Sequence, residues 1–186
     1  SWVGWGFAKY SFRGKNALFM FLLATMMFPG QVSLVPLFLL MIKFGWLDTY
    51  WAIIIPGAAN AFGVFFMRQI MLSVPDELLD AGRIDGVSEF GLFWRIAVPL
   101  SLPAMGALAI FNFLGNWNAF IWPLIVTSKR EMMTLPVGIQ FFSTEVGSNW
   151  HLIMTGASLS LVPLLIVVII FQRYIVEGIA LTGLKG

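Results

Sequence analysis

The chain has 186 residues, of which 59% are hydrophobic and only 11% are charged. A soluble domain needs about 25% charged residues to cover its surface, so this composition excludes an ordinary soluble protein and favours one embedded in a membrane. A net charge of only +2, with no basic cluster, argues against a nucleic-acid partner, and the absence of cysteine leaves no disulfide and no cysteine metal site.

Four apolar runs are long enough to cross a membrane, which takes roughly 20 apolar residues. They cover residues 16–42, 50–67, 100–126 and 153–171, and none of them contains Asp, Glu, Lys or Arg. The first ten residues are apolar but too short to span alone, which predicts that the chain begins inside another span. The predicted fold class is therefore all-α: a polytopic transmembrane helix bundle with four full spans and the end of a fifth.

Proline and glycine interrupt every predicted span, for example at Pro29-Gly30 and Pro56-Gly57. Small residues also recur four positions apart, a spacing that allows close contact between helices. Packing within the bundle and hinge motion are both compatible with these pairs, which are Gly57 and Ala61, Gly115 and Ala119, and Gly156 and Ser160.

A polar island at residues 73–103 separates the second and third spans and holds seven of the chain's twenty charged residues. Ser73 followed by Asp76 predicts a capping box at the start of a helix. Leu78, Leu79 and Ala81 give that helix a short apolar side.

The second half of the island predicts another helix. Gly86 offers a place to turn, and a helix is expected to start at Ser88 and to end at a break at Pro99. A helical hairpin kept outside the bilayer usually has a partner docked against it.

The spacing inside the island resembles a known signature. Asp80-Ala81-Gly82 is followed by three residues, Gly86, nine residues and Ile96-Ala97-Val98-Pro99. This is similar to the EAA loop of ABC-importer permeases, commonly written E-A-A, three residues, G, nine residues, I-x-L-P. Every spacing is met, while Asp80, Gly82 and Val98 depart from the usual letters. Phrases such as FNFLGNWNAFIWPL and LTGLKG are similar to the carbohydrate-importer permeases, the smaller-subunit type of maltose and glycerol-phosphate systems.

The resemblance covers essentially the whole chain and implies a type-1 permease domain at 1–186 with an EAA-like cytoplasmic loop at 73–99. It implies a bacterial cell-membrane permease subunit that imports a sugar or sugar derivative. Its partners would be a second permease subunit, two copies of a cytoplasmic ABC ATPase and an extracytoplasmic solute-binding protein. The residues expected to couple to the ATPase are Glu77, Asp80, Ala81, Gly82, Asp85, Gly86, Ile96 and Pro99.

The chain itself is expected to bind no cofactor and no metal and to catalyse no reaction. It has no Gly-rich P-loop, so ATP and Mg are expected to be used by the partner ATPase. Alternatives remain open: a permease for another small solute, such as an amino acid or phosphate, or a carrier or channel not coupled to ATP. The spans lack the ionisable groups that an ion-driven carrier normally uses.

Lys and Arg placement predicts the orientation. If the EAA-like loop is cytoplasmic, that side holds eight basic residues and the opposite side three, and the C-terminus is cytoplasmic. The eight are Lys9, Arg13, Lys15, Arg68, Arg83, Arg95, Arg173 and Lys185, and the three are Lys43, Lys129 and Arg130.

Polar residues gather in the third span, where Asn112, Asn116, Trp117 and Asn118 lie within two helical turns. Amides and indoles suit a sugar pathway, and Asn60 has the same character. Hydrogen bonding between helices, with tryptophans at the membrane interface, explains these residues equally well.

Two further segments carry predictions. The loop from Thr127 to Leu152 is expected to be external and to contact the binding protein through Phe141, Phe142, Thr144, Ser148 and Trp150, with the role centred on 140–149. Aromatic residues resting at the lipid–water boundary are the alternative. The closing residues 180–186 resemble a family tail that reaches between ATPase subunits, with a frayed terminus as the alternative.

Overall fold

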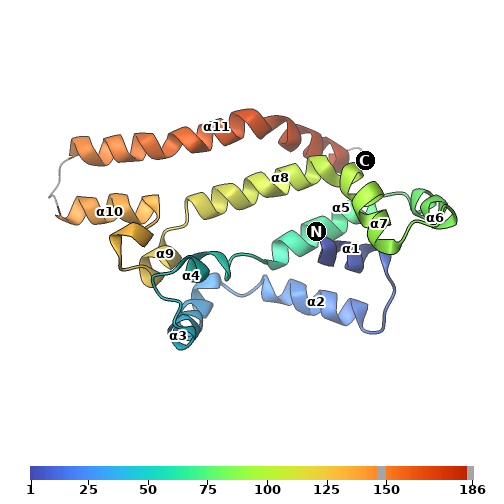
Figure 1. Ribbon diagram of the computed structural model, residues 1–186, viewed down its shortest axis with the longest axis horizontal. Helices are drawn as coiled ribbons and strands as arrows, with labels where there is room; N and C mark the ends of the chain where they lie inside the picture. Colours follow the sequence, from blue (N-terminus) through green and yellow to red (C-terminus); the bar gives the residue numbers. More distant parts are fainter. Residues whose placement is uncertain (146–149, 184–186) are drawn as a thin grey trace. The chain divides into compact units, whose positions relative to one another are not determined.

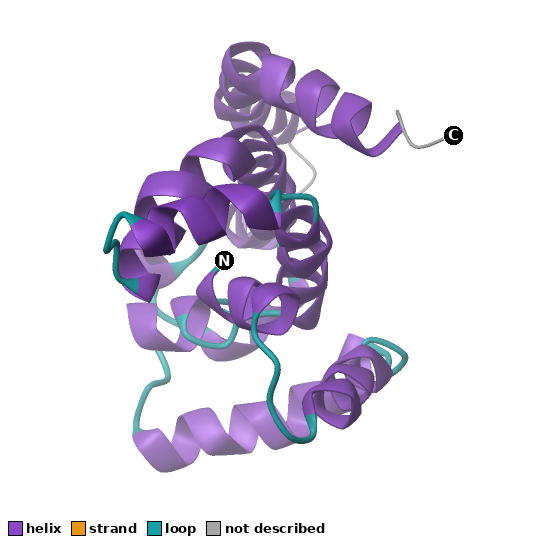
Figure 2. Cartoon of the chain, turned by 90° about the vertical axis from the view of Figure 1, so that its right-hand side faces the viewer, coloured by secondary structure: helices purple, strands orange, loops and turns teal. Residues whose placement is uncertain are grey.

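The computed structural model describes residues 1–145 and 150–183, and side chains at 143–145 and 173–183 are outside the description. Every regular element in these ranges is a helix, as Figure 2 shows, which confirms the predicted all-α class. The chain divides into two compact units, and two of its helices, α8 and α11, contribute to both.

The first unit comprises Ser1–Phe28, Asn60–Ile110 and Phe171–Gly186. It contains the part of the chain that carries the hairpin. Its α-helices, labelled in Figure 1, are α1 (Trp2–Lys9), α2 (Lys15–Thr25), α5 (Ala61–Leu72), α6 (Asp76–Ile84), α7 (Glu89–Leu92) and the first part of α8 (Val98–Trp117). A π-helical turn (Phe93–Ala97) lies between α7 and α8.

Close packing of α1 on α5 forms the centre of the first unit. Gly4 makes this approach possible, since a Cβ there would lie 2.7 Å from Met67 Cβ and 2.9 Å from the backbone nitrogen of Arg68. Arg68 Nε also donates to the carbonyl of Phe7 at 3.2 Å, and the Arg68 guanidinium lies 4.1 Å from the centroid of the Phe19 ring. Helix α1 is thereby held to α5 by both packing and hydrogen bonding.

The second unit comprises Pro29–Ala59 and Phe111–Ile170. Its elements are a 3₁₀ turn (Gly30–Ser33), α3 (Leu34–Phe44), α4 (Tyr50–Ile54), the end of α8, α9 (Ile121–Val126), a second 3₁₀ turn (Arg130–Met132), α10 (Leu135–Glu145) and the first part of α11 (Trp150–Gly183). A small core of Met41, Ala52 and Val126 joins α3, α4 and α9. Trp122 Nε1 donates to the carbonyl of Ala52 at 2.8 Å, which ties α9 to α4.

Proline and glycine divide some predicted spans but not others. The run at 50–67 is divided around Pro56-Gly57 into α4 and α5. Asn60 is the N-cap residue of α5, and its Oδ1 accepts from the N–H of Gly63 at 2.6 Å. The run at 16–42 is likewise divided at 26–29, between α2 and the first 3₁₀ turn. By contrast, Pro103 and Pro163 lie inside α8 and α11.

Two continuous helices in the described ranges, Glu89–Trp117 and Trp150–Gln172, are long and apolar enough to cross a membrane. The helices at Lys15–Thr25 and Gly30–Phe44 meet the same criteria only as a pair with a sharp bend, which fits a broken span or a re-entrant loop. The number of spans predicted from the sequence, four and part of a fifth, stays a prediction.

The predicted helix break at Pro99 is wrong, because α7, the π-helical turn and α8 follow one another without interruption. Proline lacks an N–H and normally disrupts a helix interior. Here the wider π-helical turn directly precedes Val98 and Pro99, and such turns allow a helix to continue past an irregular position. The second arm of the hairpin therefore continues without a break into the long apolar helix α8.

Candidate functional site

The hairpin consists of α6, the turn after it, α7 and the π-helical turn (residues 76–97). Helix α6 has Asp76 and Glu77 in its first turn and Arg83 in its last, an order that complements the helix dipole. The predicted capping box is wrong: no side chain caps α6, whose N-cap residue is Pro75. The Ser73 hydroxyl instead donates back to the carbonyl of Ile70 at 2.7 Å, at the end of α5.

A glycine-dependent motif closes α6, as predicted at Gly86. The N–H of Val87 donates to the carbonyl of Gly82 at 2.9 Å, and the N–H of Gly86 donates to that of Arg83 at 3.0 Å. This pair of bonds is a Schellman motif, with Gly86 in the left-handed region at φ 76°. Ser88 then caps α7, as its Oγ accepts from the N–H of Gly91 at 3.2 Å, which confirms the predicted helix start.

Gly86 is required for its backbone conformation, because its φ of 76° is unfavourable for residues with a Cβ. Space is not the reason, since a Cβ there would meet nothing within 4 Å. We expect Gly86→Val to destabilise the hairpin by about 1–2 kcal/mol, the cost of holding a residue with a Cβ in the left-handed region. Gly86→Asn should cost clearly less, because asparagine tolerates this conformation. Thermal unfolding of the purified protein in detergent measures both, and equal losses for the two variants would contradict the conformational explanation.

Gly82 allows α6 and the following helix to touch. A Cβ at Gly82 would lie 2.6 Å from Leu92 Cδ2 and 3.0 Å from Ile96 Cδ1. The signature usually has alanine at this position. Glycine here leaves room for the side chains of Leu92 and Ile96 from the second arm. Gly82 is buried, as is Leu79, whereas Leu78 and Ala81 are exposed, so only Leu79 of the three residues on the predicted apolar side of α6 lies in the core.

A buried apolar core fixes the hairpin to the rest of its unit. It is made of Trp5, Ala8, Met67, Met71, Val74, Leu79, Leu92, Phe93 and Ala97, with Val87 and Ile96 packed against it. These residues come from α1, α5, α6, α7 and the π-helical turn, except Val74 and Val87, which lie in the connections on either side of α6. Trp5 and Phe93 contact each other with ring centroids 5.9 Å apart. The hairpin is therefore a packed part of the unit and not a free loop.

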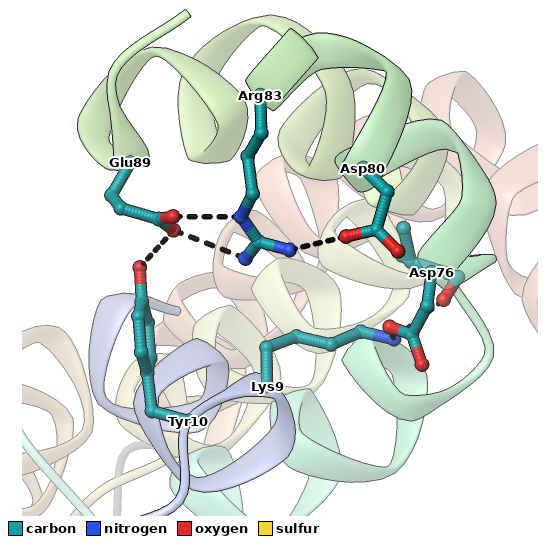
Figure 3. A network of polar contacts seen from close by, with 7 residues as sticks. Lys9, Tyr10, Asp76, Asp80, Arg83 and Glu89 are labelled. Atoms are coloured by element: carbon teal, nitrogen blue, oxygen red, sulfur yellow. Dashed lines mark hydrogen bonds and ion pairs between the residues drawn. The ribbon is translucent and has the colours of Figure 1, made fainter.

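Polar contacts join the hairpin to the end of α1, as Figure 3 shows. Lys9 Nζ donates to Asp76 Oδ1 at 2.7 Å and to the carbonyl of Val74 at 2.6 Å. Tyr10 Oη donates to Glu89 Oε2 at 2.7 Å. Sequence reasoning missed these contacts, which join residues more than sixty positions apart.

Arg83 links the two arms of the hairpin to each other. Its Nε donates to Glu89 Oε1 at 2.8 Å, and its Nη1 donates to Asp80 Oδ1 at 2.7 Å. The hydrogen bonds from Arg83 and then from Tyr10 hold the pKa of Glu89 below its ordinary value. The hydrogen bond from Lys9 lowers the pKa of Asp76 in the same way. Both carboxylates are thus stabilised in their charged form.

These pKa shifts predict a pH-dependent effect of Glu89→Gln. A carboxyl whose pKa is lowered by folding contributes stability above its unfolded pKa and loses it as the pH falls through the folded pKa. The difference in the free energy of unfolding between wild type and Glu89→Gln should therefore be constant above about pH 5 and shrink below about pH 4. The difference should be under about 1 kcal/mol, since solvent screens half-exposed ion pairs. A difference that grows on acidification would contradict the assignment.

The hairpin also carries large apolar side chains that are exposed. Ile84 is 87% exposed at the end of α6, Phe90 is 62% exposed and Trp94 is 54% exposed. The predicted coupling residues Glu77, Asp80, Asp85 and Pro99 are also exposed, while Ile96 is half-buried. Sequence reasoning missed Ile84, and its charged neighbours gave no signal, since Leu79 beside Asp80 in the same helix is buried.

The predicted substrate-path amides are engaged in local hydrogen bonds. Asn116 Nδ2 donates to the carbonyl of Asn112 within α8, and Asn118 Nδ2, one residue after α8, donates to that of Leu114, both at 2.8 Å. Trp117 Nε1 donates to the carbonyl of Ser160 at 3.1 Å, which ties α8 to α11 in the second unit. Asn60 serves as the cap of α5. Their role toward a solute stays a prediction.

The predicted external loop contains a helix, α10, so it is not an irregular connection. Phe141 lies on α10 with the Arg130 guanidinium 5.3 Å from its ring centroid. Phe142 and Trp150 are exposed, and Phe142 borders a shallow groove between α10 and α11. Thr144 lies on α10, while Ser148 and the tail residues 184–186 lie outside the described residues. Contact with a binding protein stays a prediction.

No group of three or more His, Cys, Asp and Glu side chains suited to a metal ion occurs within the part of the chain that the structure describes.

Comparison with known proteins places this geometry in a family. Residues 1–180 match the model of the family described as binding-protein-dependent transport system inner membrane component. An arabinooligosaccharides transport system permease protein of Halalkalibacterium halodurans is 42% identical over the whole chain and 67% of its own length. The corresponding protein of Bacillus subtilis is 40% identical over the whole chain and 66% of its length.

More distant proteins agree with this match. An sn-glycerol-3-phosphate transport system permease protein of Yersinia pestis is 34% identical over 91% of this chain and 61% of its own length. The crystal structure of a bacterial ABC transporter involved in the import of the acidic polysaccharide alginate superposes with a TM-score of 0.81 at 24% identity, covering 92% of this chain and 65% of that one. The chain thus spans about two thirds of the length of these proteins.

Proposed function

The chain belongs to the family of binding-protein-dependent transport system inner membrane components, and from this premise we propose that it is the membrane-spanning permease subunit of an ATP-driven importer. The observation that carries the proposal is the hairpin. Its second helix is capped by Ser88, the hairpin packs on a buried core, and it exposes an apolar side chain, Ile84, at the end of α6. A rigid projection with an exposed apolar end has the form of a docking element.

The partners of this subunit are a second permease subunit, two copies of a cytoplasmic ATPase and an extracytoplasmic solute-binding protein. The ATPase uses ATP and Mg, while this chain binds neither and catalyses no reaction. The family's inner-membrane description and the long apolar helices support a multi-pass membrane location. The excess of basic residues on the hairpin side supports a cytoplasmic hairpin and a cytoplasmic C-terminus.

In this function the hairpin transmits motion and performs no chemistry. An importer needs two global states that expose its pathway to opposite sides of the membrane. The ATPase can shift the balance between them only if it contacts the permease differently in each state. A hairpin continuous with the helix 89–117 gives the ATPase a direct connection to a membrane span.

The cargo that we propose is a sugar or sugar derivative. Two similar proteins are permeases of an arabinooligosaccharide system and one of an sn-glycerol-3-phosphate system. Amides and indoles, such as those of Asn112, Asn116, Trp117 and Asn118, suit the hydroxyls and apolar faces of a sugar. The exposed aromatic residues Phe142 and Trp150 support a binding-protein contact on the segment that carries α10.

Reconstitution of the complete transporter tests this function. The permease pair, the ATPase and the binding protein would be placed in proteoliposomes and offered radiolabelled arabino-oligosaccharides, sn-glycerol-3-phosphate and an amino acid. We expect uptake of a carbohydrate or its phosphate that requires ATP, Mg and the binding protein. Uptake that follows an ion gradient without the ATPase would overturn the proposal, and uptake of the amino acid alone would overturn the cargo.

A further inference from the structure

Two adjacent residues at the end of α1 contact the two arms of the hairpin. Lys9 bonds to the carbonyl of Val74 and to Asp76, where α6 begins. Tyr10 bonds to Glu89, where α7 begins. Both contacts are drawn in Figure 3. A segment of two residues therefore touches the base of each arm.

The Lys9 contact is difficult to break without a replacement. The Lys9 side chain is only 6% exposed, whereas that of Asp76 is 75% exposed. If the hairpin moved away from α1, the Lys9 ammonium would lose two acceptors while still largely covered by protein. Leaving a buried charged donor unpaired is costly, so the geometry favours motion of the hairpin and α1 together.

The Tyr10 contact is part of a chain of bonds through the hairpin. Glu89 accepts from Tyr10 and from Arg83, and Arg83 also donates to Asp80 in the middle of α6. The Tyr10 ring in turn packs edge-on against buried Trp5, with centroids 6.3 Å apart. One phenol hydroxyl thus connects the core of α1 with the ion pairs that hold the two arms together.

Helix α1 can transmit such a motion because it is packed tightly on α5. Gly4 brings its backbone against Met67 and Arg68, and Trp5 is fully buried. A displacement of the end of α1 is therefore resisted by backbone contacts as well as by side chains. Without the contacts of Lys9 and Tyr10, the hairpin would be held to α1 by apolar and aromatic packing, such as the edge-on contact of Trp2 with Phe93 at 4.6 Å, and no hydrogen bond of Figure 3 would join them.

We propose that Lys9 and Tyr10 form a clasp that keeps the hairpin fixed to α1 throughout the transport cycle, so that motion imposed on the hairpin is delivered to α1 as well as to α8. They are positioning residues, acting through Asp76 and Glu89 on the orientation of the hairpin. This inference rests on the proposed function and adds to it a second route by which the ATPase acts on the membrane helices.

The first test measures the solute transported per ATP hydrolysed by the reconstituted transporter. Tyr10→Phe removes one hydroxyl and leaves the ring, and Lys9→Met removes the ammonium and leaves an apolar stem. We expect Tyr10→Phe to lower the transport-to-hydrolysis ratio by about tenfold, which corresponds to the loss of one charge-assisted hydrogen bond, and Lys9→Met, which removes two, to lower it at least as much. ATPase association should stay at the wild-type level, because neither residue lies on the exposed face of the hairpin.

The matched control is Arg13→Gln, which removes a positive charge from the same connection between α1 and α2. Arg13 is exposed, and the contacts of Figure 3 do not include it. This variant should keep the wild-type ratio. A wild-type ratio in both Tyr10→Phe and Lys9→Met, or an equal loss in Arg13→Gln, would overturn the clasp.

A second test separates a clasp that stays closed from one that opens. The 186 residues contain no cysteine, so Lys9→Cys with Asp76→Cys can be joined by a short bifunctional thiol reagent in a complex whose other cysteines are replaced. We expect the joined protein to transport more solute per ATP than the same double variant left unjoined. Arrest of transport by the joint would show that the hairpin must leave α1 and would overturn the proposal.

The two proposals fail in different ways. If the wild-type complex assembles and transports while the clasp variants couple normally, only the clasp is wrong. If the wild-type chain retains no ATPase, the proposed function and the clasp both fall. A melted hairpin would show as lost ATPase association in Tyr10→Phe, and that result also contradicts the clasp, which assigns this hydroxyl to coupling and not to folding.

Discussion

Gly4→Ala should destabilise the protein by about 1–3 kcal/mol, although alanine is the better helix former. The reason is geometric. A Cβ at Gly4 would lie 2.7 Å from Met67 Cβ and 2.9 Å from the Arg68 nitrogen, and neither atom can move without shifting α5 itself. The helices would have to separate, which would loosen the core around Trp5. Thermal or denaturant unfolding of the purified protein in detergent measures the loss.

Gly6→Ala in the same helix is the matched control. A Cβ at Gly6 meets nothing within 4 Å, so the substitution adds no clash. Exchanging glycine for alanine inside a helix stabilises it by up to about 1 kcal/mol. The two substitutions, two positions apart, should therefore change stability in opposite directions. Equal effects would show that α1 does not pack on α5 in this way.

Ile84→Lys should abolish most of the coupling to the ATPase while leaving the isolated protein as stable as wild type. Ile84 is 87% exposed, and a lysine in the last turn of α6 suits the helix dipole, so folding has no reason to suffer. Placing a charge at the centre of an apolar contact typically costs about 2 kcal/mol or more, roughly a thirtyfold loss of affinity. Co-purification of the ATPase and solute-stimulated ATP hydrolysis measure the effect.

Ile84→Leu, which keeps the apolar volume, provides the comparison and should remain close to wild type in both assays. Unfolding midpoints of the two variants should agree within the range usual for surface substitutions, about 0.5 kcal/mol. If Ile84→Lys still binds the ATPase and supports normal hydrolysis, the exposed end of α6 is not the docking surface. The role of the hairpin would then have to be assigned to another face.

The parts of the hairpin that depend on local sequence were predictable. A glycine after an acidic helix and a serine three residues before Gly91 set a turn and a cap through bonds between near neighbours. The EAA-like spacing at residues 80–99 located the hairpin because it too is a local pattern in the sequence. The all-helical class followed from composition and apolar run length, which express the demands of a membrane directly. The family was indicated separately, by the resemblance of residues 80–99 to the EAA loop.

Other features depend on contacts that no local pattern encodes. The bond from Lys9 to Asp76 spans 67 residues, and its existence requires α1 to lie against the hairpin. The choice between Leu78 and Leu79 as the buried residue of α6 rests on a rotation of about 100°, which a helix of this length does not determine by itself. The cap predicted at Ser73 is wrong because α6 begins only at Asp76, after Pro75, whereas Ser73 ends α5 and its hydroxyl donates to the carbonyl of Ile70.

The π-helical turn at Phe93–Ala97 sets the angular phase between the hairpin and the helix after it. Each residue of an α-helix turns the chain by about 100°, so accommodating one more residue in a wider turn rotates everything beyond it. The buried faces at Leu92 and Phe93 and at Ala104 are therefore related by a fixed angle that depends on the residue count between them. The nine residues between Gly86 and Ile96 therefore fix the rotation of the hairpin about the helix axis as well as its distance. Deleting one of them would turn the buried side of the hairpin away from the core.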